Sequence, residues 1–194
     1  MRRPSLLLPL CSLALIALAL LAAPVRAEEK KMVENPAYKE WAKHKVGALA
    51  RYEMVNDAMG GQKITMTQTL VELTESKAVI QTSMAMDMGG QVMQVPGQKR
   101  EEPKMVAEGT LPMGMPASSE KPTITEGTAS VTTPAGTFDC KWTEGKGKSG
   151  DGTYVFKVWN SDQVPGGMVM METQSTSGGQ TTKTSMKLIE MKKP

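Results

Sequence analysis

The chain has 194 residues, and its 23 lysines and arginines barely outnumber its 20 aspartates and glutamates. Arg2, Arg3 and Arg26 lie in the first 27 residues, which hold no acidic residue, so the rest of the chain carries 20 charges of each sign. A near-neutral chain has no basic surplus with which to bind polyanions, and we therefore expect no nucleic-acid partner.

The first 27 residues predict export. A positive start, Met1–Arg3, precedes the apolar run Leu6–Ala23, and Val25–Ala27 ends in the small residue that a signal peptidase accepts. We expect cleavage after Ala27, which leaves residues 28–194 as one domain with no stable membrane span, secreted or periplasmic. The alternative is an uncleaved anchor, since the apolar run is close to the ~18–20 residues that a span needs.

A short helix is predicted at the start of the mature chain, after a loose leader at Glu28–Val33. Asn35 is a good N-cap and Pro36 suits the first helical position, while Gly47 can end the helix. The only histidine, His44, would lie in the last turn, and no residue beside it indicates a ligand or catalytic role. The apolar face of this helix would carry Tyr38, Trp41 and Ala42.

Most of the remaining chain alternates polar and apolar residues between glycine-containing turns, which predicts strands joined by hairpins. Near Leu70 the alternation changes phase, which indicates a bulge. The predicted strands are Ala48–Val55, Gln62–Leu73, Lys77–Met88, Ile124–Thr133, Thr137–Glu144, Thr153–Asn160, Met168–Gln174 and Gln180–Met191.

Residues 91–121 predict an irregular excursion. Pro96, Pro103, Pro112 and Pro116 exclude a long central strand, so we expect a short edge strand at Gln91–Val95 and then an extended surface segment. Within this segment, residues 111–116 are apolar and are expected to cover an open edge or mouth of the sheet.

Alternation also predicts which strand face is buried. Even-numbered residues of 78–88, 138–142 and 154–158 are mostly apolar, and we expect all of them on one buried side of the sheet. Cys140 belongs to this set and is interpreted as a buried, unreactive hydrophobic residue. After cleavage it is the single cysteine, so no internal disulfide can form.

The predicted fold class is therefore mainly β: a curved antiparallel meander sheet or incomplete β-barrel with one short N-terminal helix. A long meander must curl, close or cover its edges. The helix and the segment at 91–121 are expected to cover one opening of the sheet.

Two stretches carry a resemblance: NPAYKEWAKHKVG at 35–47, and VTTPAGTFDCKW with VWNSDQVPGGMV between 131 and 169. The chain resembles an uncharacterised family of small secreted bacterial proteins, and the pattern is similar to exported proteins with the half-barrel of the outer-membrane lipoprotein carriers. Those carriers wrap a sheet around a helical lid, and together the sheet and lid hold acyl chains. The resemblance touches about half of the mature chain and rests on turn motifs, which specify shape more than chemistry.

The sequence lacks the usual motifs of enzymes. The mature chain holds one histidine and one cysteine, and no metalloprotease, phosphate-loop, dinucleotide or nucleophile-elbow motif occurs. We therefore expect a non-enzymatic protein with no catalytic residues and no cofactor.

Methionine is the unusual component, with 17 residues including the initiator. Its flexible side chain suits an adaptable apolar surface, so the hypothesis is an apolar sheet face that binds a lipid or an apolar peptide segment. The alternative is Cu(I) binding by thioethers in the cell envelope. Neither hypothesis fixes the oligomeric state. The predicted ligand-binding residues are Met84, Met86, Met88, Met113, Met115, Phe138 and Trp142.

Overall fold

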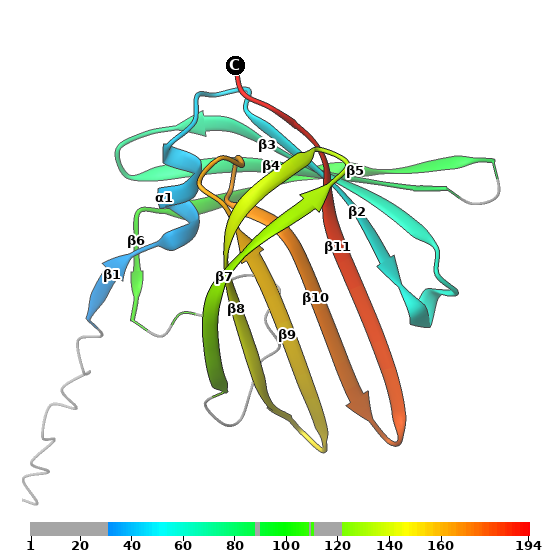
Figure 1. Cartoon of the computed structure of the whole chain (residues 1–194). Helices are drawn as coiled ribbons and strands as arrows, with labels where there is room; N and C mark the ends of the chain where they lie inside the picture. The colour runs from blue at the N-terminus through cyan, green and yellow to red at the C-terminus, as the bar shows by residue number, and fades with distance from the viewer. Residues whose placement is uncertain (1–30, 88–89, 109, 111–121) are drawn as a thin grey trace, which may run out of the picture.

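The structure, a computed structural model, describes residues 31–87, 90–108, 110 and 122–194. The predicted cleavage site, Met88, Met113 and Met115 lie outside these residues. The described chain forms a curved nine-stranded antiparallel sheet, a separate two-stranded sheet and one short α-helix (Figure 1). The mainly β fold class is therefore confirmed, and the large sheet keeps two edges rather than closing into a barrel.

The nine strands form two hairpin series. One contains β2 to β5 and the other β7 to β11, and they join where the first strand of one pairs with the last strand of the other. In order across the sheet, the strands are β5 (Val92–Pro103), β4 (Lys77–Asp87), β3 (Lys63–Leu73), β2 (Leu49–Asn56), β11 (Gln180–Lys192), β10 (Met168–Ser177), β9 (Gly152–Asn160), β8 (Gly136–Ser149) and β7 (Thr123–Thr133).

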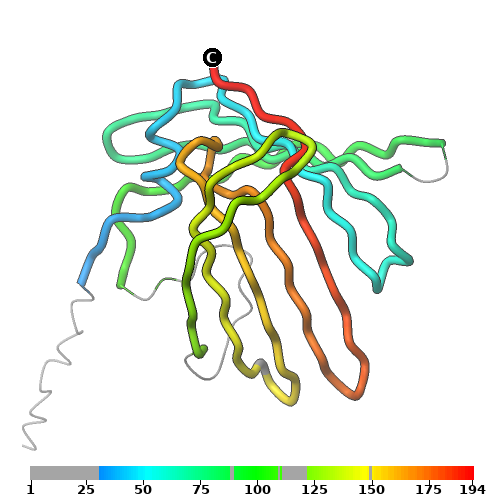
Figure 2. The backbone as a smooth tube through the Cα atoms, viewed as in Figure 1, coloured from blue at the N-terminus to red at the C-terminus, as the bar shows by residue number. Residues whose placement is uncertain are grey.

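The helix α1 (Pro36–Ala42) begins as its sequence predicts. The Asn35 side chain accepts a hydrogen bond from the Ala37 N–H at 3.0 Å, and Pro36 occupies the first turn. It ends at Ala42, earlier than expected, where the His44 N–H donates to the Trp41 carbonyl three residues back at 3.0 Å. Gly47 lies beyond the helix, and its N–H donates to the Leu70 carbonyl of β3 at 2.8 Å. Figure 2 shows the helix lying against one end of the curved sheet.

The helix packs through its apolar face. Tyr38 and Trp41 are buried on residues of β3 and β4, and the Tyr38 hydroxyl donates to the Thr74 carbonyl at 2.9 Å. This hydrogen bond holds α1 over one part of the sheet, and a space remains beside the helix. The cluster under the helix consists of Tyr38, Trp41, Ala48, Leu70, Ala78 and Ile80.

Two expectations for extended segments are wrong. Met32 and Val33, expected to belong to a loose leader, are part of β1 (Met32–Glu34), which pairs with β6 (Met105–Ala107). The edge strand expected to stop at Val95 continues to Pro103 as β5, because the register with β4 shifts where Pro96 occurs. A bulge on an edge strand accommodates a proline without losing a central ladder bond. The bulge expected near Leu70 is confirmed by the register shift between Leu70 and Glu72.

The expectation that all even-numbered residues share one face is also wrong. Trp142 on β8 lies opposite Trp159 on β9, so the even residues of β8 share a face with the odd residues of β9. The cause is the hairpin turn at Gly150-Asp151, because turn length sets the register and a one-residue difference reverses every side chain. Cys140 is buried as expected.

Candidate functional site

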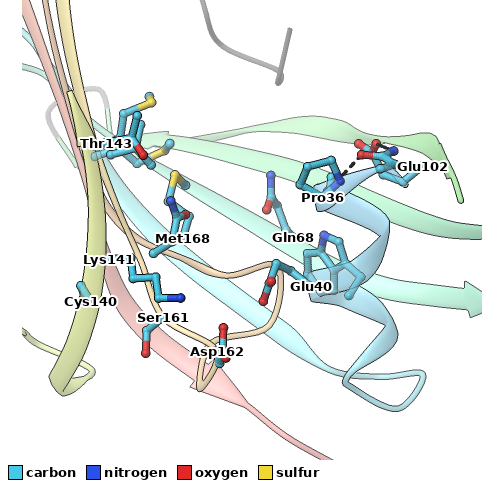
Figure 3. Close-up of a pocket in the computed structure, with 18 of the residues that line it drawn as sticks. Pro36, Glu40, Gln68, Glu102, Cys140, Lys141, Thr143, Ser161, Asp162 and Met168 are labelled. Atoms are coloured by element: carbon cyan, nitrogen blue, oxygen red, sulfur yellow. Dashed lines mark hydrogen bonds between the residues drawn. The ribbon is translucent and has the colours of Figure 1, made fainter. Parts of the chain in front are cut away.

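A cleft of about 1540 Å³ lies on the concave side of the large sheet. One boundary is α1 together with the loop 161–167, and the others are strands from both hairpin series (Figure 3). The helix α1 packs on residues of β3 and β4 through Tyr38 and Trp41, and it also lies against the loop 161–167. The space opens between these elements and the remaining strands that line the cleft.

Six methionines from five strands form the apolar wall of this cleft. Met171 on β10 lies opposite Met186 on β11, which lies opposite Met54 on β2. Residues opposite one another on antiparallel strands share a face and have Cβ atoms about 4.5–5.5 Å apart. The wall therefore carries a continuous row of thioethers. The six are Met54, Met66, Met84, Met168, Met171 and Met186.

The loop 161–167 holds the helix side of the cleft. Its ends are joined by the Ser161 N–H, which donates to the Gly167 carbonyl at 2.7 Å. Gly166 has φ +77°, and a Cβ placed there would lie 2.7 Å from Cζ2 of Trp41. The Trp41 ring, which is 2% exposed and lines the cleft, therefore lies directly on the backbone of this loop.

Ion pairs connect the helix to the loop, and hydrogen bonds connect it to β5. Lys43 contacts Glu40 at 2.8 Å and Asp162 at 3.0 Å. The Glu40 hydrogen bond raises the pKa of Lys43, and Lys43 in turn lowers the pKa of Asp162. At the other end of α1, Asn35 donates to Glu102 at 3.1 Å and to the Pro103 carbonyl at 2.9 Å.

The opposite wall, formed by β7, β8 and the end of β9, is polar. Most of the lining residues here belong to one strand face. Ala129 and Cys140 of the other face also line the cleft, whereas Phe138 and Trp142 of that face do not. Gln68, which is buried, adds an amide on the methionine side. The cleft is therefore amphipathic. The polar wall consists of Thr128, Ser130, Asp139, Lys141, Thr143 and Asn160.

The residues predicted from sequence take different positions. Met84, 39% exposed, lines the cleft, and Met86 is half-buried on the same strand face without lining it. Phe138 is buried in the main hydrophobic cluster, and Trp142 is half-buried with the Lys157 ammonium 4.1 Å from its ring centroid. Sequence reasoning missed the five other cleft methionines and Trp41, whose proximity depends on strand pairing rather than on local pattern.

His44 and Cys140 are of residue types that can take part in catalysis, and burial shifts the pKa of both. Burial lowers the pKa of His44, and its Nε2 is buried without a hydrogen-bond partner. Burial raises the pKa of the Cys140 thiol, with the Asp139 charge as the second cause. Within the described residues, no group of three or more histidines, cysteines, aspartates and glutamates is arranged to hold a metal ion. In the same part of the chain, no helix has the length and hydropathy to cross a bilayer.

Comparison with known proteins gives two structural similarities. No protein-family model and no curated protein matches the chain. A "putative lipoprotein" from Parabacteroides distasonis superposes with a TM-score of 0.45 at 13% identity, over 77% of this chain and 96% of that chain. A "putative exported protein with YmcC-like fold" from Bacteroides fragilis superposes with a TM-score of 0.40 at 13% identity, over 77% of this chain and 97% of that chain.

Proposed function

We propose that this protein is an exported, non-enzymatic carrier or sensor that binds the apolar chain of a lipid in the cleft between α1 and the methionine wall. The single observation that carries the proposal is a cleft of about 1540 Å³ lined by six methionines on the sheet and by Trp41 on the helix side. This volume exceeds the roughly 300–1,000 Å³ of typical small-molecule sites. Unbranched thioether side chains adapt to a flexible apolar chain.

The resemblance to the half-barrel of the lipoprotein carriers supports the same proposal. In that arrangement a curled sheet and a helical lid hold acyl chains. Here α1 takes the position of a lid at one end of the cleft, although it is a single helix of seven residues. An apolar segment of a partner protein would fit the same wall, and competition with a fatty acid separates the two ligands.

The test is a titration with a long-chain fluorescent fatty acid. We expect saturable binding of one ligand per chain. Met171→Trp fills the cleft and should weaken binding about tenfold or more, because excluding two methylenes from an apolar wall costs about 1.6 kcal/mol. Met170→Trp is the matched control, since Met170 is the neighbouring half-buried residue but does not line the cleft.

Equal weakening by both substitutions, or no saturable binding at all, would refute the proposal. If an apolar peptide bound and a fatty acid could not displace it, the ligand would be a protein segment instead.

A second candidate function is Cu(I) binding, favoured by the row Met171–Met186–Met54. Three thioethers on adjacent strands are soft ligands of the kind that Cu(I) prefers. Replacing all three by leucine should abolish a Cu(I) site while keeping fatty-acid affinity within a few fold, because the swap approximately conserves volume. Native mass spectrometry with Cu(I) that finds no bound metal in the parent protein would eliminate this candidate.

A further inference from the structure

Among the described residues, seven charged side chains line the cleft, and five of them take part in ion pairs. Because Glu40 and Asp162 share the single ammonium of Lys43, these pairs leave one negative charge uncompensated beside α1 and the loop 161–167, and the other pairs are balanced. Glu40 and Asp162 share Lys43, and Glu101 pairs with Lys77 at 2.6 Å. Glu102 pairs at 2.6 Å with Arg100, which also lines the cleft. The five are therefore Glu40, Arg100, Glu101, Glu102 and Asp162.

The other two charges are Asp139 and Lys141, both exposed on β8. Neither takes part in an ion pair among the described residues. They are two residues apart and so share the cleft face of the strand, with about 7 Å between their Cα atoms. Figure 3 shows the Lys141 side chain extending from β8 into the cleft, toward the loop that carries Asp162.

Strand pairing defines which of Lys141 and Asp139 lies nearer to the methionine wall. Lys141 lies opposite Asn160 of β9, and Asn160 lies opposite Met168 of β10, so one cross-strand row leads from Lys141 to the apolar wall. β9 ends at Asn160, and Asp139 therefore lies beyond this row, farther from the methionines. Along β8, in the direction away from the row that contains Met168, the cation of Lys141 therefore comes first and the anion of Asp139 second.

We propose that Asp139 and Lys141 bind the head group of a zwitterionic phospholipid of the phosphoethanolamine type. This inference rests on the proposed lipid-binding function. In such a lipid the phosphate follows the acyl chains and the ammonium is outermost, which is the order in which Lys141 and Asp139 are met. The phosphate accepts from the Lys141 ammonium, and the lipid ammonium donates to the Asp139 carboxylate.

Other head groups fit less well. A carboxylate or phosphatidylglycerol head carries only negative charge and would leave the Asp139 carboxylate repelling it or unused. A neutral glycerol head would use neither charge. The neighbouring hydroxyls of Thr128 and Ser130, opposite Lys141 and Asp139 on β7, can donate to the phosphate but do not select its charge.

The experiment compares ligands that share one acyl chain and differ in the head group. Lyso-phosphatidylethanolamine, lyso-phosphatidylglycerol and a monoacylglycerol are titrated as monomers into the full mature chain by calorimetry. We expect the phosphatidylethanolamine form to bind about tenfold more tightly than the monoacylglycerol, since two exposed charge pairs each contribute about a three-fold factor. Lys141→Gln and Asp139→Asn should each lower that affinity about three-fold and leave monoacylglycerol binding unchanged.

Matched controls separate these contacts from general surface charge. Lys183→Gln and Asp151→Asn remove exposed charges that do not line the cleft, and they should leave all affinities unchanged. Asp139→Asn should also remove the preference for lyso-phosphatidylethanolamine over lyso-phosphatidylglycerol.

The outcomes distinguish this inference from the proposed function. If all three lipids bind equally well and neither substitution matters, the head-group inference is wrong and the lipid-binding function stands. If no lipid binds, both fall. If water-soluble glycerophosphoethanolamine binds as tightly as the lysolipid, the pair recognises a free zwitterion and the lipid assignment is overturned.

Discussion

Gly166→Ala tests whether the loop 161–167 supports α1. The residue has φ +77°, a left-handed conformation that costs a residue with a Cβ about 1–2 kcal/mol. The new Cβ would also lie 2.7 Å from the Trp41 ring, which cannot move freely because it is 2% exposed and packed on the cluster under the helix. Crowding of this kind costs about 1–3 kcal/mol, so the free energy of unfolding should fall by about 2–5 kcal/mol.

Urea unfolding followed by circular dichroism measures this loss. With an m-value of about 2 kcal/mol/M, the midpoint should fall by about 1–2.5 M. Gly150→Ala is the control, because Gly150 has φ +58° and nothing within 4 Å of the added methyl group, so only the conformational cost applies. In a Trp41→Phe background, which removes the clashing ring atoms, Gly166→Ala should cost no more than the control. Equal losses for Gly166→Ala and Gly150→Ala in the parent protein would refute the packing of Trp41 on this loop.

Three further predictions concern the Cys140 thiol, the Glu53 carboxylate and the export signal. Cys140 is buried, and burial raises the pKa of its thiol, so iodoacetamide at neutral pH should alkylate the native protein at least tenfold more slowly than the urea-unfolded chain. Equal alkylation rates, measured by mass spectrometry, would contradict the buried position of Cys140. Lys63 at 3.0 Å and Lys187 at 3.2 Å lower the pKa of the Glu53 carboxylate. The charged carboxylate therefore stabilises the fold above the pKa that Glu53 has in the unfolded chain, and this contribution is lost as the pH falls through its lower pKa in the folded protein. Glu53→Gln should therefore cost about 0.5–1 kcal/mol at pH 7 and progressively less below about pH 4.5, and a pH-independent difference in unfolding free energy would exclude this cause. Export should remove residues 1–27, and an intact mass that retains them would disprove the predicted cleavage.

Local features of the fold could be predicted from the sequence. Asn35-Pro36 starts the helix because capping depends on adjacent residues, and the bulge near Leu70 was visible as a change of phase. The strand that was expected to end at Glu144 continues to Ser149 through Gly145 and Gly147. The side chains of Phe156 and Tyr154 on β9 cover those glycines. The Phe156 ring lies 2.3 Å from where a Cβ of Gly145 would be, and the Tyr154 hydroxyl lies 2.6 Å from where a Cβ of Gly147 would be.

Contacts between distant segments could not be predicted in this way. Alternation identified Met84 and Met86 on one strand, but it contains no information that β2 pairs with β11. That pairing brings Met54 beside Met186, and the neighbouring pair of β10 and β11 adds Met171. The cleft is a product of these non-local pairings and of the position of α1, so its lining could be recognised only in the folded chain.

Methionine-methyl NMR of the mature protein, labelled with ¹³C at the methionine methyl groups, tests the central claim most directly. On addition of a long-chain fatty acid we expect the resonances of the cleft methionines, such as Met54, Met171 and Met186, to shift together and to saturate at one equivalent. Resonances of Met32, Met59 and Met105, which are exposed and do not line the cleft, should stay unchanged. Shifts confined to these outer methionines, or no shift at saturating fatty acid, would contradict lipid binding in the cleft.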